Sequence, residues 1–263
     1  VGISNGQRCT LTLRDQTLGE QNISEQSRLA PGDWVVVTGG ARGVTAEISV
    51  ALAQAYKSTL LLLGRSSEPT ETEADWLKGL TDEVQIKQAI LEQSSDGLNE
   101  VRTPQALEKQ YRRIIAEREI RNTLKRIEAV GGQAVYRSVD VRDAQAVAHT
   151  IEQTQQEIAV GKGIRGLVHG AGVLADRFIE DKTDEQFDNV FTTKVEGLRS
   201  LLHILEHEDL KMMAIFSSST GRFGRKGQID YAAANEVVNK LAQQEARLRP
   251  SCRVVSVNWG PWD

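Results

Sequence analysis

The sequence has few cysteines and no long apolar run, and these absences exclude several protein classes. Its two cysteines, Cys9 and Cys252, lie far apart and lack metal-ligand spacing. They predict neither a disulfide framework nor a metal site, and they fit the reducing cytoplasm. No apolar run is long enough to span a bilayer, and the first residues, VGISNGQRCT, lack a charged segment followed by an apolar core. We therefore expect a cytoplasmic protein without metal or membrane contact.

The sequence also lacks an excess of positive charge. Its 32 Lys and Arg residues against 36 Asp and Glu residues give a formal net charge of -4, with the two signs interspersed. A nucleic-acid-binding surface would need Lys and Arg clustered on one face. The expected partners are therefore small molecules or proteins, not nucleic acids. With 263 residues, the chain is long enough for one large α/β domain.

The first 33 residues differ from the rest of the chain. Cys9, Leu11 and Leu13 alternate with polar residues, and the segment then becomes polar before a Pro-Gly-Asp turn at residues 31–33. We predict one short strand and a linker over residues 1–33. Because the chain begins without Met inside a strand-like segment, we expect it to be part of a larger polypeptide. A processed or engineered terminus would give the same pattern.

A glycine-rich turn follows the first predicted buried strand, at residues 34–37, and leads into TGGARGVTAEISVALAQAY, which has helical periodicity. Glycines there permit a tight turn and close approach to a pyrophosphate, and the free N–H groups of the helix N-terminus bind phosphates. The alternative is a glycine-rich turn without a ligand, but the strand–turn–helix context favours a nucleotide site. The expected cofactor-binding residues of this turn are Thr38, Gly39, Gly40, Arg42, Gly43 and Val44.

The next predicted strand, over residues 59–63, ends in Gly64-Arg65-Ser66. At this position of a dinucleotide-binding fold, an acidic residue would bond a free 2′-hydroxyl, whereas an arginine accommodates a 2′-phosphate. Arg65 and Ser66 therefore predict NADPH rather than NADH as the cofactor, and Arg42 adds a second positive charge nearby. The alternative is that both arginines are solvated surface charges.

Residues 67–125 form a charged, helix-forming stretch that is much longer than a strand-to-strand crossover requires. We interpret this stretch as a helical insertion rather than a second domain. Its apolar face would pack on the sheet or against a partner and contains Leu107, Tyr111, Ile114, Ile115, Ile120, Leu124 and Ile127.

The predicted fold class is α/β, with a doubly wound parallel sheet (Rossmann fold) over residues 34–263 and the insertion after its second main strand. Strands over residues 134–139 and 166–169 should each end at the cofactor. An Asp after the first would contact adenine, and small residues after the second would let the backbone approach a bound ring. The cofactor-binding residues expected there are Asp140, Val141, Gly170, Ala171 and Gly172. Asp176 follows in a loop expected to overhang the substrate mouth.

The stretch over residues 216–235, FSSSTGRFGRKGQIDYAAAN, is the candidate active site. It begins at the end of a predicted strand, residues 212–216, and enters a helix that carries Tyr231. Ser218 and Tyr231 would both reach one substrate oxygen, and such a pair could protonate a carbonyl as hydride arrives. The alternative is an ordinary turn rich in Ser and Gly, followed by a helix with a half-buried Tyr. A last strand is expected at residues 253–258.

Lys194 lies among apolar residues of a long predicted helix that contains FDNVFTTKVEGLRSLLHIL. Helical spacing alone predicts that its ammonium group extends to solvent. If the side chain instead reaches the cleft, its charge would favour the phenolate form of Tyr231. His169, His203 and His207 are interpreted as structural or exposed, because none has a metal-ligand companion.

The ordered motifs TGGARG, GRS, DV, HGAGVLAD, FSSS and YAAAN, together with Lys194, resemble those of ketoreductase domains of polyketide and fatty acid synthases. These domains belong to the short-chain dehydrogenase/reductase superfamily. The resemblance covers about residue 34 to the end. It implies NADPH-dependent reduction of a 3-oxoacyl thioester on an acyl carrier protein, within a multidomain synthase. The TGGARGVTA loop and the insertion are most similar to reductase domains of bacterial polyunsaturated fatty acid synthases.

The resemblance also implies four catalytic residues, Lys194, Ser218, Tyr231 and Asn235. Tyr231 matches the proton donor, Ser218 the hydroxyl that holds the carbonyl oxygen, and Lys194 the lysine that acts on the phenol. Classical short-chain reductases place this lysine four residues after the tyrosine, but here that position is Asn235. This is the exchanged arrangement of synthase-type reductases. One departure is Thr45, where the family often has a third glycine.

Two residues bear on the configuration of the product. Asp176 matches the last acid of a Leu-Asp-Asp signature, with Ala175 in place of the middle acid, and Phe223 stands where reductases of opposite outcome carry Trp. The resemblance therefore favours a D-hydroxy product. Two other functions stay open: a catalytically silent, structural ketoreductase-like domain, and a free-standing short-chain reductase of small carbonyl compounds.

Overall fold

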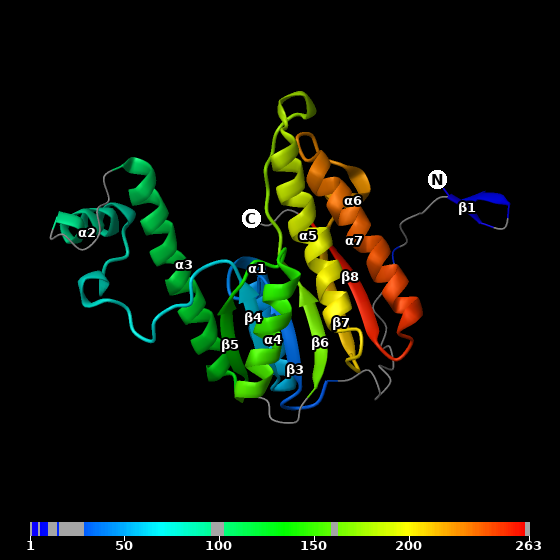
Figure 1. Cartoon of the computed structure of the whole chain (residues 1–263), viewed down its shortest axis with the longest axis horizontal. Helices are drawn as coiled ribbons and strands as arrows, with labels where there is room; N and C mark the ends of the chain where they lie inside the picture. The colour runs from blue at the N-terminus through cyan, green and yellow to red at the C-terminus, as the bar shows by residue number, and fades with distance from the viewer. Residues whose placement is uncertain are drawn as a thin grey trace.

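A six-stranded parallel sheet forms the centre of the molecule (Figure 1), in a computed structural model that describes residues 2–4, 6–9, 15, 29–95, 103–158 and 163–260. The strand order is β5-β4-β3-β6-β7-β8. The chain first adds β4 and β5 on one side of β3, and it then adds β6, β7 and β8 on the other side, so the order reverses between β3 and β6. In such sheets, ligands bind beyond the carboxyl ends of the strands at this reversal. The predicted doubly wound sheet is confirmed, and its strands are β3 (Trp34–Thr38), β4 (Thr59–Gly64), β5 (Gln133–Ser138), β6 (Ile164–His169), β7 (Met212–Ser218) and β8 (Arg253–Trp259).

The central strands are apolar on both faces because helices cover both sides of the sheet. Trp34 and Val36 of β3 belong to one core cluster, whereas Val35 and Val37 belong to the other. This alternation follows from the two-residue period of side chains along a strand. The four leucines of β4 are likewise fully buried, and complete burial of each stabilises the fold by about 1.5–3 kcal/mol.

Helices from different parts of the chain form the two outer layers (Figure 1). One layer contributes Leu52 and Ile120 to its core cluster, and the other contributes Ile151, Leu198 and Val238. The first layer consists of α1 (Gly43–Tyr56) and the second half of α3 (Pro104–Ala129); the second consists of α4 (Ala144–Ile158), α5 (Asp184–Ile204) and α7 (Ile229–Leu248). Between β7 and α7 lies the short helix α6 (Thr220–Phe223).

The predicted insertion follows β4 and projects from the sheet as an arm (Figure 1). It contains a 3-10 turn (Asp75–Leu77), α2 (Glu83–Ser95) and the first half of α3. The arm has its own small core, centred on Ile86, Ile90 and Ile114. The single apolar face expected over residues 107–127 therefore serves two cores: its first residues pack in the arm, and its later ones, among them Ile120 and Ile127, pack on the sheet.

The first residues form a short antiparallel pair rather than the single strand predicted. β1 (Gly2–Ser4) pairs with β2 (Gln7–Cys9), and the turn between them contains Gly6 with a positive φ of 75°. Strands of three residues are too short to show the alternation that identifies a strand in a sequence. Leu11 and Leu13 lie outside the described residues. Within the described ranges, no helix combines the length and apolar character that a membrane span requires.

Candidate functional site

A cleft of about 320 Å³ lies beyond the carboxyl ends of β3, β4, β5 and β6. Eight of the predicted cofactor-binding residues line it: Gly39, Arg42, Arg65, Ser66, Val141, Gly170, Ala171 and Gly172. The other predicted ones, Thr38, Gly40, Gly43, Val44 and Asp140, lie next to lining residues. Sequence reasoning did not assign to the cofactor the remaining lining residues, which are Ala41, Thr45, Leu63, Gly64, Tyr136, Val139, Val173 and Thr193.

The glycine turn after β3 brings two backbone segments into contact. Gly39 has a φ of 71°, and a Cβ there would lie 3.2 Å from the backbone nitrogen of Ala171. A Cβ at Gly40 would lie 2.5 Å from Cγ1 of Val37. Gly39 therefore allows the β3 and β6 turns to approach each other, whereas Gly40 is required by packing on the core.

The N-terminus of α1 opens onto this turn. Its N-cap residue is Arg42, and in the described structure the side chain of this residue makes no capping hydrogen bond. The first N–H groups of a helix have no partner within the helix, and they carry partial positive charge. The turn therefore offers an anion such as a phosphate both backbone donors and a positive helix end.

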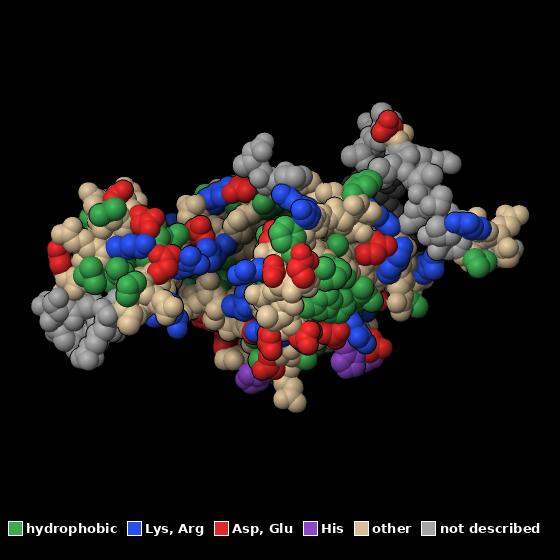
Figure 2. Space-filling view, turned by 90° about the horizontal axis from the view of Figure 1, so that it is seen from above, with side chains coloured by type: hydrophobic (Ala, Val, Ile, Leu, Met, Phe, Trp, Pro, Cys, Tyr) green, Lys and Arg blue, Asp and Glu red, His purple; other side chains and the backbone are tan. Residues whose placement is uncertain are grey.

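Arg42, Arg65 and Ser66 all line the far end of the cleft. Nη1 of Arg42 lies 3.4 Å from Oγ of Ser66, and Nε of the same arginine is paired with Glu119 of α3. A second groove of about 510 Å³ continues from there along α3, past Lys109 and other basic residues. Seen from above (Figure 2), Lys and Arg side chains, interspersed with Asp and Glu, follow one another from the arm toward the middle of the molecule.

Tyr136 of β5 supports the Arg65–Ser66 turn from below the cleft. Its hydroxyl donates a hydrogen bond of 2.7 Å to the backbone oxygen of Ser66. Burial raises the pKa of this phenol to about 12, so it remains a neutral donor. A Cβ at Gly64 would lie 3.0 Å from the phenol oxygen, so the glycine makes room for the tyrosine. Tyr136 was missed because it is 70 residues away from Ser66 and has the apolar character of any buried strand residue.

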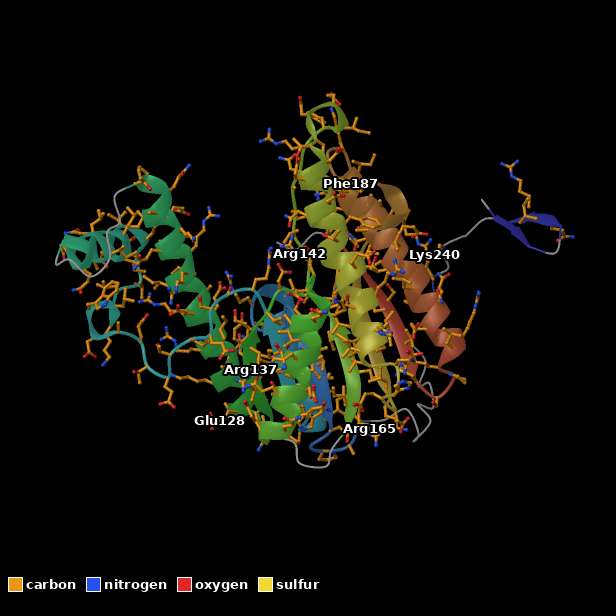
Figure 3. All side chains as sticks on the ribbon, in the orientation of Figure 1. Glu128, Arg137, Arg142, Arg165, Phe187 and Lys240 are labelled. Carbon is orange, nitrogen blue, oxygen red and sulfur yellow. The ribbon has the colours of Figure 1, made fainter. Side chains whose placement is uncertain are left out.

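Asp140 is engaged by a neighbouring arginine. Nη2 of Arg142 lies 2.6 Å from Oδ2 of Asp140, and hydrogen bonding from this guanidinium is the main cause that lowers the pKa of the carboxyl. Arg142, labelled in Figure 3, also donates to Asn189 of α5. Val141, the residue after Asp140, lines the cleft. Contact of Asp140 with adenine stays a prediction.

Thr45 occupies the position where the related motif often has a third glycine. Its side chain is buried and packs against Gly170: a Cβ at Gly170 would lie 2.5 Å from both Cγ2 and Oγ1 of Thr45. The two positions are therefore complementary, because the missing side chain on the β6 turn leaves the space that the threonine fills. The departure at Thr45 is accommodated without closing the cleft.

Lys194 does not extend to solvent, contrary to what helical spacing alone predicts. Its residue surface is 4% exposed, and its ammonium group donates a hydrogen bond of 2.7 Å to the backbone oxygen of Phe216. Nζ lies 5.9 Å from the centroid of the Tyr231 ring. Burial lowers the pKa of Lys194 to about 8. A Cβ at Gly172 would lie 3.3 Å from Cε of Lys194, which places the lysine beside the cleft.

Ser218 and Tyr231 come from adjoining elements. Ser218 is the last residue of β7 and is buried, and its Oγ accepts a hydrogen bond of 3.1 Å from the backbone nitrogen of Thr220. Tyr231 is half-buried in the first turn of α7. Oγ of Ser217 donates to the backbone oxygen of Asn235 over 3.1 Å, which joins the strand end to this helix.

Asn235 is fully buried one turn after Tyr231. Its Nδ2 donates a hydrogen bond of 2.7 Å to the backbone oxygen of Tyr231. Its Oδ1 has no hydrogen-bond partner among the described residues. Buried polar atoms are normally paired, so this oxygen is an acceptor available to a donor such as water. The residue that faces the phenol ring is Lys194.

His169 holds the backbone of Lys194 in place. Its Nδ1 lies 2.9 Å from Oγ1 of Thr38, and its Nε2 lies 2.9 Å from the backbone oxygen of Lys194. Burial, and secondarily the charge of Lys194, lower the pKa of this histidine to about 3. His169 is therefore neutral and links β3, β6 and α5. His203 and His207 are exposed.

The loop after β6 lies against the loop before α7. Oδ2 of Asp176 accepts a hydrogen bond of 2.8 Å from Nε2 of Gln228, and the backbone nitrogen of Arg177 donates to the backbone oxygen of Gly227 over 3.0 Å. Phe223 on α6 is 70% exposed. The loop that contains Asp176 is therefore fixed to the segment that precedes Tyr231.

Comparison with known proteins gives consistent matches. Residues 33–263 match the KR domain family. The whole chain is 37% identical to a part of one polyunsaturated fatty acid synthase polypeptide of Thraustochytrium sp., of which it spans 9%. The ketoreductase PlmKR1 from the first module of phoslactomycin biosynthesis in Streptomyces sp. HK803 is 29% identical, with a TM-score of 0.61, over 89% of this chain and 42% of its own. A ketoreductase domain from the bacillaene assembly line is 28% identical, with a TM-score of 0.61, over 88% and 44%.

Proposed function

This chain belongs to the KR domain family of ketoreductases, and from that premise we propose that it reduces a 3-oxoacyl thioester on an acyl carrier protein to a 3-hydroxyacyl thioester, with NADPH as the reductant. The observation that carries the proposal is the position of the buried Lys194 between the Tyr231 ring and the cleft at Gly172. A catalytically silent domain would not need a lysine desolvated at this point.

The residues of the cleft fit NADPH. The uncapped N-terminus of α1 and the close approach at Gly39 suit the pyrophosphate. Arg42, Arg65 and Ser66 at the far end suit the 2′-phosphate, because arginine forms strong charge-assisted bonds with phosphate. The small residues over 170–172 leave room for the nicotinamide beside Lys194. When bound there, NADPH supplies the hydride that is added to the carbonyl carbon.

Proton transfer is assigned to the catalytic residues of the chain. The hydroxyl of Ser218 holds the substrate carbonyl oxygen, and the phenol of Tyr231 donates its proton to that oxygen. The charge left on the phenolate is balanced by the ammonium group of Lys194, which is still mostly protonated at pH 7 because its pKa is about 8. Asn235 fixes the first turn of α7 through its bond to the Tyr231 backbone.

Substrate and partners follow from the similarity to synthase domains. The chain would act as one domain of a multidomain polyketide or polyunsaturated fatty acid synthase, with an acyl carrier protein and other synthase domains as its partners. The chain spans less than a tenth of the synthase polypeptide to which it is similar. The Asp176–Gln228 bond fixes an acid at the mouth of the site, in line with the D-hydroxy product that the sequence favours.

The direct test follows NADPH absorbance with a 3-oxoacyl N-acetylcysteamine thioester. Replacing Tyr231 by Phe removes the proton donor and should lower kcat at least about 100-fold. Tyr111→Phe, on the arm, is the matched control and should be as active as the wild type. A fully active Tyr231→Phe variant would contradict the mechanism.

The same assay separates the two competing functions. A wild-type protein that binds NADPH but turns over neither thioesters nor small ketones would be a structural domain. Rapid reduction of small ketones with no turnover of the thioester would indicate a free-standing reductase of small carbonyl compounds. Turnover of the thioester in preference to small ketones supports the proposed function.

A further inference from the structure

Lys182 and Asp230 form a buried ion pair outside the catalytic set. Nζ of Lys182 lies 2.7 Å from Oδ2 of Asp230, and the two side chains are 4% and 1% exposed. Nζ of Lys182 also donates to the backbone oxygen of Ala175 over 2.6 Å. Oδ1 of Asp230 accepts a hydrogen bond of 2.9 Å from the backbone nitrogen of Tyr231. The pair therefore contacts Ala175, in the loop over residues 175–182 that we call the mouth loop, and the proposed proton donor Tyr231.

The pair joins the two helices that carry Lys194 and Tyr231. Lys182 directly precedes Thr183, the N-cap of α5, and α5 carries Lys194. Asp230 lies in the first turn of α7, next to Tyr231. The two helices lie side by side (Figure 1). The ion pair therefore connects their N-terminal ends, which fixes how far one helix can slide or rotate against the other.

Stability alone does not explain a charged pair at this place. Desolvation of two buried charges often costs as much as their attraction returns. A lysine at the N-terminus of α5 also faces the positive end of the helix dipole, which is unfavourable. Asp230, by contrast, lies at the N-terminus of α7, where a negative charge is favoured. What the pair does provide is a single geometry, because both charges are satisfied only in this arrangement.

Two further hydrogen bonds also attach the mouth loop to the segment before α7. Gln228 donates to Asp176 over 2.8 Å, and the backbone of Arg177 donates to Gly227 over 3.0 Å. The segment over residues 175–182 is thus attached to the residues before and within the first turn of α7 at successive points. Among these contacts, the Lys182–Asp230 pair is the one in which both partners are charged and buried.

We propose that the Lys182–Asp230 pair positions Tyr231 relative to Lys194 and holds the mouth loop, residues 175–182, against the site. Both residues are positioning residues that act through their contacts with α5, α7 and the loop. The kinetic part of this proposal rests on the proposed reductase function. A displacement of about 1 Å at a reacting group lowers a rate about 100-fold, so a loosened pair should act on kcat.

The kinetic experiment compares Lys182→Met and Asp230→Asn with the wild type. Each change should lower kcat about 100-fold and leave the Kd for NADPH within about twofold, because neither residue lines the cofactor cleft. Lys182→Arg, which keeps the charge, should recover part of kcat. In the double variant Lys182→Met/Asp230→Asn, the loss should be smaller than the product of the two single losses, because the residues act as a pair.

Glu245→Gln is the matched control. Glu245 is paired with Arg249 at the opposite end of the same helix α7, over 3.0 Å, with side chains 11% and 18% exposed. Loss of this pair should lower thermal stability and leave kcat unchanged. Equal loss of kcat in Asp230→Asn and Glu245→Gln would overturn the positioning role, because it would show a general effect of breaking an ion pair on α7.

Hydrogen–deuterium exchange tests the positioning role of the Lys182–Asp230 pair without a measurement of catalysis. In Asp230→Asn, peptides over residues 174–182 and the first turn of α7 should exchange faster than in the wild type, whereas in Glu245→Gln they should not. If the wild type reduces no thioester, the proposed function fails, while hydrogen–deuterium exchange still tests the positioning role of the ion pair. If a single variant does not fold, the double variant, which leaves no unpaired buried charge, is measured instead. Unchanged exchange in these peptides would overturn the proposal.

Discussion

The two ends of the cleft are built differently. At the end proposed to bind the 2′-phosphate, here called the phosphate end, Arg42 and Arg65 are exposed and lie on turns. At the end proposed for proton transfer, here called the reaction end, Lys194, Ser218 and Asn235 are buried and lie on a strand end and two packed helices. Exposed charges attract and select a ligand but are weakened by water and salt. Buried groups have shifted acidities and fixed positions, which proton transfer requires. Under the proposed function, cofactor recognition and proton transfer are therefore separated along one cleft.

Replacing Lys194 tests the reaction end and should have the largest effect. Lys194→Met removes the buried charge beside Tyr231, and kcat should fall about 10²- to 10⁴-fold. The Kd for NADPH, measured by fluorescence titration, should change much less. Lys240→Met, an exposed lysine of α7 labelled in Figure 3, is the control with unchanged kcat. If the cofactor Kd rises as much as kcat falls, the separation of the two ends is wrong.

Replacing Arg65 tests the phosphate end. Arg65→Glu puts a negative charge where the 2′-phosphate is expected, so the Kd for NADPH should rise about 100-fold, from a lost charge-assisted bond and added repulsion. Affinity for NADH should change little. Isothermal titration with both cofactors gives the ratio. Equal weakening of NADPH and NADH would refute the assignment of Arg65 to the 2′-phosphate.

Acid should destabilise the reaction end through His169. The pKa of this histidine is about 3 in the folded protein and near 6.5 when unfolded, so below pH 6.5 only the unfolded chain takes up the proton. The free energy of unfolding should therefore fall with pH, by about 2 kcal/mol at pH 5. Urea unfolding between pH 7 and 5 measures it. His169→Gln should lose this dependence, whereas the exposed His203→Gln should keep it.

The rate of reduction should fall as the pH rises through about 8, because Lys194 loses its charge there. At pH 9, one unit above this pKa, about a tenth of the lysines remain protonated, so kcat should be about tenfold lower. Initial rates at saturating cofactor and substrate give the profile. A rate that stays constant to pH 10 would show that the lysine charge does not limit proton transfer.

Local sequence patterns predicted the sheet well because each strand is a short apolar run between turn residues. β3 and β4 begin at the predicted residues and end one residue later than expected. The glycine turn and the Arg65–Ser66 position were also readable, because they follow directly from a strand end. The packing of α3 was harder to predict, because a single helical periodicity runs through the whole helix. The change from the core of the arm to the core of the sheet depends on contacts distant in sequence.

Residues of the site that depend on distant partners escaped local reasoning. Spacing on α5 placed Lys194 at solvent, but the carbonyl of Phe216, 22 residues later, draws its ammonium group inward. Spacing left an action of Lys194 on Tyr231 only as an alternative, and the family resemblance assigned the catalytic role that we propose for it. The Lys182–Asp230 pair is separated by 48 residues and matches no motif considered in the sequence. Helical and strand periods describe one element at a time, so they cannot show which polar groups meet across elements.

The helix α3 has a consequence for how the arm can move. Its 26 residues form one uninterrupted rod, about 39 Å long at 1.5 Å per residue. One half is embedded in the core of the sheet, and the other half is the backbone of the arm. A rod clamped along half its length cannot hinge, so the arm holds a constant reach from the cofactor cleft. A molecule bound to the arm would therefore stay at a constant distance from Arg42.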